Sequence, residues 1–192
     1  MAIFLKSKET VFIHIPKTAG ESLSNWLTNF ANGQQIGWKH CSINDLTITE
    51  YKHSFTIVRH PFDRFTSWYS HLVRELKTKG SKRNRETRKI IAMCEKEEGI
   101  NSYIDYCLND YSPHYLIWKP QISFINSNTE IFRYENLNTD FKKIQKSVEC
   151  FEDLPTVNKS NRINSSLSNK SKEVLRKIYK EDFINFNYRE DV

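Results

Sequence analysis

Two segments of this sequence carry residues that could bind anions. In the first, FIHIPKTAGESL over Phe12–Leu23, an apolar run leads into Pro-Lys-Thr-Ala-Gly and then into a helix-like pattern. Such a turn places backbone N–H groups at a helix N-terminus, where they attract an anion. Lys17 adds a mobile positive charge, and Thr18 and Ser22 add hydroxyl donors. The segment therefore predicts a phosphate-binding turn. The alternative is an ordinary strand-to-helix turn with an exposed lysine.

The second segment, FTIVRHPFDRFTSWY, places Arg59 directly after a predicted strand. Ligands of open α/β sheets bind at the carboxyl ends of the strands. Ser67 follows two turns into the next predicted helix and could face the same pocket. A guanidinium binds phosphate bidentately, so this pair is a candidate second phosphate site. Arg64 could instead pair with Asp63 or Glu75 on the surface.

The elements that must position these residues alternate between strands and helices. Short β-branched and aromatic runs predict strands, and apolar residues at three- and four-residue spacing predict helices. This order favours an α/β fold in which a central parallel sheet is flanked by helices, with one domain over residues 1–192. The expected strands are Thr10–Ile15, Ser54–Val58 and Thr129–Arg133; the expected helices are Gly20–Phe30, one from Pro61, Ile90–Glu98, Ile100–Leu108, Leu137–Val148 and Lys170–Phe183.

Composition is that of a globular protein with a basic surface. The 192 residues are 38% hydrophobic and 27% charged, and 29 Lys+Arg against 23 Asp+Glu give a net charge of +6. This surplus suggests an anionic partner, such as nucleic acid, acidic lipid, a polyanionic sugar or a phosphorylated small molecule.

Other classes of protein are disfavoured by what the sequence lacks. No apolar stretch approaches the roughly 20 residues of a membrane span, and the first residues lack the apolar core of a secretory signal. A cytoplasmic location is therefore expected. The four cysteines are scattered and have no clustered histidines, so no metal is expected.

Taken together, the two anion-binding segments resemble the PAPS-dependent sulfotransferases (PAPS is 3′-phosphoadenosine 5′-phosphosulfate). The closest resemblance is to the branch with the signatures HIPKTAGTS and RxPxxRxxSxY, which includes carbohydrate sulfotransferases. Further segments are similar to motifs of that branch, in the same order, up to Tyr188. They are KHCSINDL at Lys39–Leu46, Gln121 with Phe124, YENL at Tyr134–Leu137, Asp140-Phe141, Leu154-Pro155, Asn158, Ser160, Tyr179, Asp182-Phe183, Phe186 and Tyr188.

The resemblance implies a P-loop-NTPase-like sulfotransferase fold and a role for each matching residue. Arg59 and Ser67 would hold the 3′-phosphate of PAPS. Glu21 stands where the family usually has threonine, and a carboxylate beside a polyanion is unfavourable, so this side chain is expected to point away or to meet a cation. The residues implied to hold the 5′-phosphosulfate are Lys17, Thr18, Ala19, Gly20, Glu21 and Ser22.

Transfer to a hydroxyl also benefits from a general base with a pKa near neutrality, which favours histidine. His40 matches the histidine of the family's KHxT segment and is the predicted base, with Lys17 neutralising the leaving group. His14 falls inside a predicted strand, where a buried core role is favoured and a site role is the alternative. Glu135 is a rival base, because some sulfotransferases use glutamate.

The predicted function is thus transfer of a sulfuryl group from PAPS to an acceptor hydroxyl, carried by a glycan or a small molecule, with release of PAP (3′-phosphoadenosine 5′-phosphate). Two other functions stay open: a non-catalytic PAP-binding protein, and a nucleic-acid-binding module using the basic stretch Lys77–Lys89, although no nucleic acid is expected. That stretch could also bind an anionic acceptor, or be a solvated loop. A nucleotide kinase is disfavoured because Lys17 precedes Gly20, unlike in the Walker pattern.

Overall fold

The computed structural model describes residues 2–48, 50–78, 85–96, 98–109, 116–154 and 166–190. The chain divides into two units, each described separately below. The first comprises Met1–His60 and Pro120–Lys159, and the second comprises Pro61–Lys119 and Ser160–Val192. The expectation of a single domain over residues 1–192 stays a prediction.

The first unit is built on a five-stranded sheet with the order β3-β1-β2-β4-β5. Its three strands β2, β4 and β5 are parallel, with Phe12 opposite Phe55 and Ile57 opposite Phe132. The other two pairings, β1 with β2 and β1 with β3, are antiparallel. The strands are β1 Ala2–Leu5, β2 Thr10–Ile13, β3 Gln34–Ile36, β4 His53–Val58 and β5 Thr129–Arg133.

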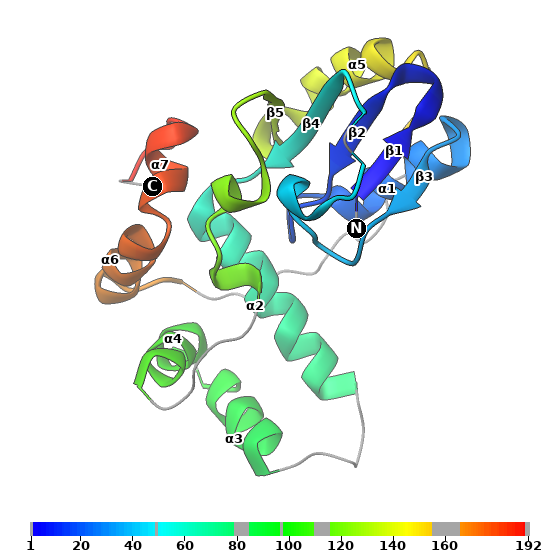
Figure 1. Ribbon diagram of the computed structural model, residues 1–192. Coiled ribbons are helices and arrows are strands. Elements are labelled where there is room, and N and C mark those ends of the chain that lie inside the picture. The colour runs from blue at the N-terminus through cyan, green and yellow to red at the C-terminus, as the bar shows by residue number, and fades with distance from the viewer. Residues whose placement is uncertain are drawn as a thin grey trace. The chain divides into compact units, whose positions relative to one another are not determined.

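Two helices, α1 (Gly20–Phe30) and α5 (Leu137–Val148), cover one face of this sheet (Figure 1). Their apolar side chains and those of the strands form one buried cluster, which includes Phe12, Trp26 and Phe55. Trp26 also contacts Phe141 edge-on, with ring centroids 5.0 Å apart, so the two helices pack against each other as well as on the sheet. The prediction of an α/β fold is confirmed, and the sheet is mixed rather than wholly parallel.

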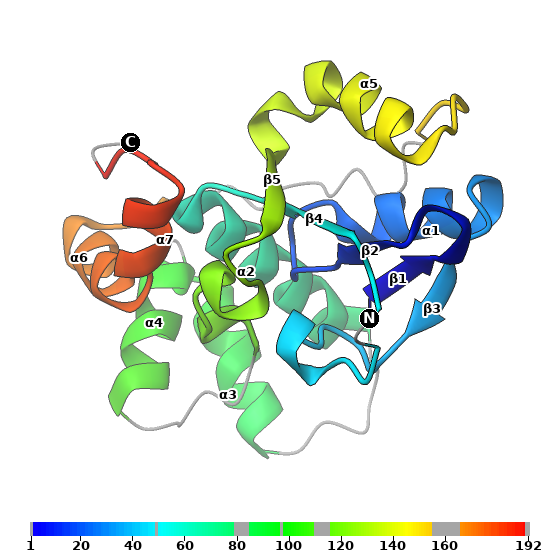
Figure 2. The same cartoon turned by 45° about the horizontal axis from the view of Figure 1, so that its top comes forward.

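The second unit is helical within the described residues (Figure 2). Aromatic rings link its helices: Trp68 contacts Tyr103, and Phe62 contacts Phe183. The predicted last helix is two helices that meet at Tyr179. The helices are α2 Pro61–Thr78, α3 Arg85–Cys94, α4 Gly99–Asn109, α6 Asn169–Ile178 and α7 Lys180–Asn185.

Arg64, on α2, is a buried charged residue of the second unit. Its side chain is 0% exposed, and its guanidinium donates to the main-chain oxygens of Lys119 (3.0 Å) and Leu116 (3.5 Å). Burial lowers the pKa of Arg64 from its ordinary value, while Tyr179 and the buried Asp182 oppose that shift. The reading of Arg64 as a surface ion-pair partner is therefore wrong: this side chain joins α2 to the segment before Pro120.

Candidate active site

The turn between β2 and α1 has an unusual backbone conformation. Lys17 and Ala19 both lie in the left-handed region, each with a φ of 68°. For residues with a side chain this costs roughly 1–2 kcal/mol, and such strain is concentrated at functional sites. The Thr18 hydroxyl, in a residue that is 0% exposed, donates to the main-chain oxygen of Ile15 at 2.9 Å and helps to hold the turn.

The turn leads directly into the N-terminus of α1. Ala19 is the N-cap residue, and among the described residues no side chain caps this end. The positive end of the helix dipole and the first N–H groups of a helix favour an anion. Glu21 is exposed in the first turn, where a carboxylate is favourable to the same dipole, and Ser22 is half-buried. This explains how the helix accommodates an acidic residue in the predicted phosphate-binding turn.

Glycine is required at position 20 because the His14 ring lies against this residue. A Cβ atom at position 20 would lie 2.1 Å from Cδ2 and 2.6 Å from Nε2 of the His14 ring. His14 is 5% exposed and directly follows β2, so its imidazole occupies the space that a side chain on the first residue of α1 would need. The expected burial of His14 is confirmed, and its ring contacts the predicted phosphate-binding turn.

The loop before β4 brings His40 to the same place. Nδ1 of His40 lies 3.1 Å from the main-chain oxygen of His14, 26 positions earlier, and the two rings meet edge-on with centroids 4.6 Å apart. A carbonyl oxygen can only accept, so Nδ1 carries the proton and, in the neutral ring, Nε2 carries the lone pair. This is the tautomer that a base acting through Nε2 needs.

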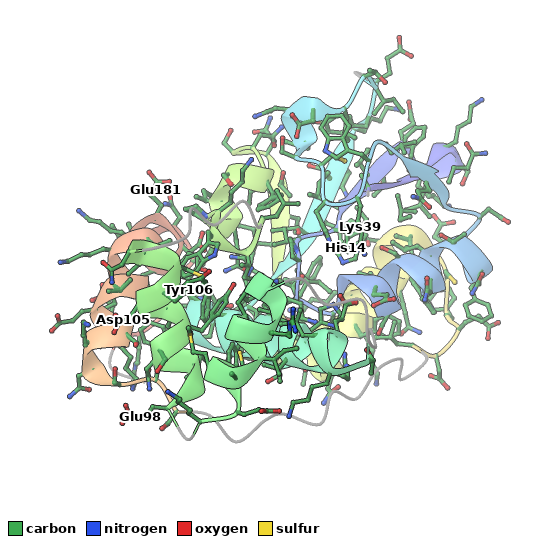
Figure 3. The ribbon with its side chains drawn as sticks, turned by 90° about the horizontal axis from the view of Figure 1, so that it is seen from below. His14, Lys39, Glu98, Asp105, Tyr106 and Glu181 are labelled. Atoms are coloured by element: carbon green, nitrogen blue, oxygen red, sulfur yellow. The ribbon has the colours of Figure 1, made fainter. Side chains whose placement is uncertain are left out.

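Positive charge converges on this region. Burial is the main reason that the pKa of His14 lies well below its usual value, and the charges of His40, the N-terminal amino group, Lys39 and Lys17 lower it further. Lys39 and His14 lie close together (Figure 3). An anion bound at the turn would therefore be stabilised by cations from two loops.

Arg59 is held beside the same turn. Its backbone N–H donates to Oε1 of Gln121 at 2.9 Å, and its carbonyl accepts from Nε2 of Gln121 at 2.8 Å. Its guanidinium donates to the main-chain oxygen of Lys17 at 3.3 Å and lies 4.1 Å from the centroid of the Tyr134 ring. The structure thus brings together the turn that carries Lys17 and the arginine after β4.

Two further residues, Ser67 and Glu135, are candidates for this site from the sequence. Ser67 is 6% exposed on α2 in the second unit, so its pairing with Arg59 stays a prediction. Oε1 of Glu135 accepts the backbone N–H of His60 at 2.7 Å. The Glu135 carboxylate therefore fixes the backbone that follows Arg59, which disfavours it as the rival base.

Two residues that position this site received no role from the sequence. Gln121 is 0% exposed and holds the backbone of Arg59, and the ring of Tyr134 lies against the Arg59 guanidinium. Both belong to segments that match family motifs, and this match was the feature of the sequence that could have indicated a role. Both lie far from Arg59 in the sequence, so no local pattern predicts that they contact it.

The remaining expectations concern metal, membrane and the basic stretch. Within the described ranges no group of three or more His, Cys, Asp or Glu side chains could hold a metal ion. No helix in the described part of the chain is long and apolar enough to cross a membrane. A cytoplasmic location stays a prediction. Residues 79–84 of the basic stretch Lys77–Lys89 lie outside the described residues, and Lys77 is paired with Glu95 at 3.7 Å.

The fold and the site define an α/β protein whose first strand-to-helix turn is suited to bind an anion. A family model described as the sulfotransferase family matches residues 2–189. The chain belongs to the sulfotransferase family, which implies a transferase that takes a sulfuryl group from a sulfate donor and passes it to a hydroxyl acceptor. Searches of curated proteins and of solved structures find no match.

Proposed function

We propose that this protein transfers a sulfuryl group from PAPS to an acceptor hydroxyl and releases PAP. The observation that carries the proposal is the bond from the Arg59 guanidinium to the main-chain oxygen of Lys17. It joins two cationic segments, at the ends of β2 and β4, at one place. A donor with phosphate groups at both its 5′ and 3′ positions needs two such anion sites, whereas a donor with a single phosphate group needs one.

The residues of the first unit fit the two ends of this donor. The 5′-phosphosulfate would bind at the N-terminus of α1, where the backbone is strained and no side chain among the described residues caps the helix. The 3′-phosphate would bind Arg59, and Ser67, which belongs to the second unit, is proposed as its second ligand from the motif resemblance alone. The residues proposed for the 5′ end are Lys17, Thr18, Ala19, Gly20, Glu21 and Ser22.

In the proposed reaction, the acceptor oxygen forms a bond to sulfur while the bond between sulfur and the bridging oxygen breaks. His40 takes the hydroxyl proton on Nε2, because Nδ1 is held by the carbonyl of His14. Lys17 neutralises the charge that develops on the leaving 5′-phosphate. The bound donor supplies the sulfuryl group and the leaving group, and the protein supplies position and charge.

The acceptor class is proposed from the same loop that carries His40. The main-chain N–H of Cys41 donates to the oxygen of Trp38 at 3.1 Å, which closes a turn over positions 38–41. Trp38 is 58% exposed, and Lys39 is exposed beside it. An aromatic face and a cation next to the base suit an acceptor with a flat apolar face and an anionic group. We therefore propose a carbohydrate acceptor, in line with the branch that the motifs resemble.

The donor is tested by calorimetric titration of the protein with PAP, adenosine 5′-phosphosulfate and ATP. We expect PAP to bind most tightly, because only PAP and its parent PAPS carry the 3′-phosphate for Arg59. Labelled PAPS is then supplied with a panel of glycans and small alcohols. Absence of PAP binding would overturn the proposal. Salt-dependent binding of RNA without any nucleotide preference would support the nucleic-acid alternative instead.

The base is tested with His40→Ala. We expect the transfer rate from labelled PAPS to fall by about 100-fold or more, because proton transfer contributes 10²–10⁴-fold to such reactions. PAP affinity should stay within about threefold, since this side chain is not proposed to hold the nucleotide. The matched control is His53→Ala, which removes a partly exposed histidine paired with Glu130 at 3.0 Å and should transfer at the normal rate. An unchanged rate in His40→Ala would remove His40 from the mechanism.

A further inference from the structure

We propose that the His14 side chain is a positioning residue that sets the place of the base His40 relative to the donor-binding turn. The proposal rests on the proposed function, because it assigns roles to the same turn and the same base. It concerns a residue that touches neither substrate in the mechanism above and acts through its two neighbours.

The first observation is that one imidazole lies against both parts of the site. On one side the His14 ring fills the space next to Gly20, where a Cβ atom would approach Cδ2 to 2.1 Å. On the other side the ring contacts the His40 ring edge-on at 4.6 Å and an interplanar angle of 82°. A shift of the His14 ring would therefore move the start of α1 and the base together.

The second observation is that His14 is itself held firmly. It directly follows β2, and both of its sequence neighbours, Ile13 and Ile15, are 0% exposed. Nδ1 of His14 lies 3.5 Å from the hydroxyl of Ser24, one turn further along α1 than Gly20. The main-chain oxygen of His14 also accepts the Nδ1–H of His40. Sites built on a rigid strand hold their groups more precisely than sites built on loops alone.

The third observation is that a neutral ring suits this place. Burial, together with the charges of His40, the N-terminal amino group, Lys39 and Lys17, keeps the pKa of His14 well below its usual value. A cationic ring at this position would repel the cations proposed to bind the donor. His14 can therefore lie among these cations without adding to their repulsion, and the base is left to His40.

The test uses the full chain with His14→Ala and His14→Phe. We expect His14→Ala to lower the single-turnover transfer rate from PAPS by about 100-fold, because a misplacement of about 1 Å costs that much. PAP affinity should fall by less than about tenfold, so that the loss lies mainly in the transfer step. His14→Phe keeps a flat ring in the same space and should restore the rate to within about tenfold of the original.

A spectroscopic readout needs neither donor nor acceptor. Long-range ¹H–¹⁵N NMR reports which nitrogen of His40 carries the proton. We expect the Nδ1–H tautomer in the original protein and in His14→Phe, and a mixture of tautomers in His14→Ala. The main-chain oxygen at position 14 remains in that variant, but the His40 ring loses its edge-on contact with the His14 ring and can turn away from this oxygen. His53→Ala is the control and should leave the His40 signals unchanged.

A double variant tests the same contact from the side of α1, and Gly20→Ala alone can be measured even if His14→Ala folds poorly. Gly20→Ala alone should weaken PAP binding, because its methyl group meets the His14 ring. In the His14→Ala background the same methyl group fills the vacated space, so its cost should be at least about fivefold smaller. Equal costs in the two backgrounds, or a transfer rate and His40 tautomer that do not respond to His14→Ala, would overturn the positioning role. A protein that binds no PAP but shows the tautomer change would refute the proposed function, and only the placement of the His40 ring by His14 would then be supported.

Discussion

Two arginines, Arg59 and Arg64, stand five positions apart in the sequence on either side of Pro61, and both are buried, with 5% and 0% of their surfaces exposed. Their partners differ. Arg59 is held through its backbone by Gln121, and its guanidinium lies over the ring of Tyr134 and donates to the main-chain oxygen of Lys17. Arg64 is held through its guanidinium, which donates to two main-chain oxygens.

The difference shows that burial of an arginine does not by itself indicate a binding site. Gln121 fixes the backbone of Arg59 and therefore the point from which its side chain projects. Which ligand the guanidinium binds then depends on the groups around it. The guanidinium of Arg64 serves the packing of the helices, with Asp182 as a buried counter-charge. The two arginines differ in the clamp that Gln121 forms on the backbone of Arg59 and in the groups around each guanidinium. This difference can be tested one residue at a time.

The largest effect is expected for Arg64→Met. Removing this guanidinium leaves Asp182 without its buried counter-charge and two main-chain oxygens without their donor, which should lower the free energy of unfolding by about 3–5 kcal/mol. Urea denaturation measures this loss. Arg74→Met, which changes an exposed arginine on the same helix, should cost less than about 0.5 kcal/mol. Similar costs for the two variants would mean that Arg64 does not stabilise the second unit.

Arg59→Gln should weaken ligand binding, whereas Arg64→Met should lower stability. We expect PAP affinity to fall by about 100-fold, equivalent to about 2.7 kcal/mol, because a charge-assisted bond to the 3′-phosphate is lost. Affinity for adenosine 5′-phosphosulfate, which has no 3′-phosphate, should change by less than about threefold. Calorimetry with both ligands measures the difference. An equal loss for both ligands would place Arg59 at the 5′ end or in a purely structural role.

Gln121→Leu tests whether the clamp on the Arg59 backbone matters for binding. The substitution leaves the buried N–H and carbonyl of Arg59 without partners, so we expect PAP affinity to fall by about tenfold, or about 1.4 kcal/mol. Gln121→Glu keeps the acceptor for the N–H and loses the donor to the carbonyl, and should lie between Gln121→Leu and the original protein. If PAP binds all three proteins equally, Gln121 supports the fold only.

The smallest effect is expected from protonation of His14, which changes the free energy of unfolding with pH. Its pKa is lowered in the folded state, so the unfolded chain binds more protons below its ordinary value of 6.5. The free energy of unfolding should therefore fall on acidification, by about 1 kcal/mol from this residue between about pH 7 and pH 5.5. In His14→Phe this contribution is absent, and stability should depend less on pH. Urea denaturation at both pH values compares the two proteins, and identical pH dependence would show that the pKa of His14 is not lowered on folding.

Much of the fold could be predicted because its elements have strong local patterns. The helices Gly20–Phe30 and Leu137–Val148 and the strand Thr129–Arg133 have the predicted bounds. The strand predicted for Thr10–Ile15 ends at Ile13, because the chain turns there toward α1. The strands β1 and β3 were not predicted, since they are only four and three residues long and are defined by their pairing with each other and with β2.

The sequence by itself determined the kinds of residue at the proposed site and the family: a lysine-bearing turn before a helix, an arginine after a strand, and motifs in order along the chain. It could do so because each motif is contiguous, and its local conformation follows from neighbouring residues. Only the tertiary structure decided which residues meet. His40 contacts His14 across 26 positions, and Gln121 holds Arg59 across 62. Such contacts depend on how the strands are ordered in the sheet, which no local pattern encodes.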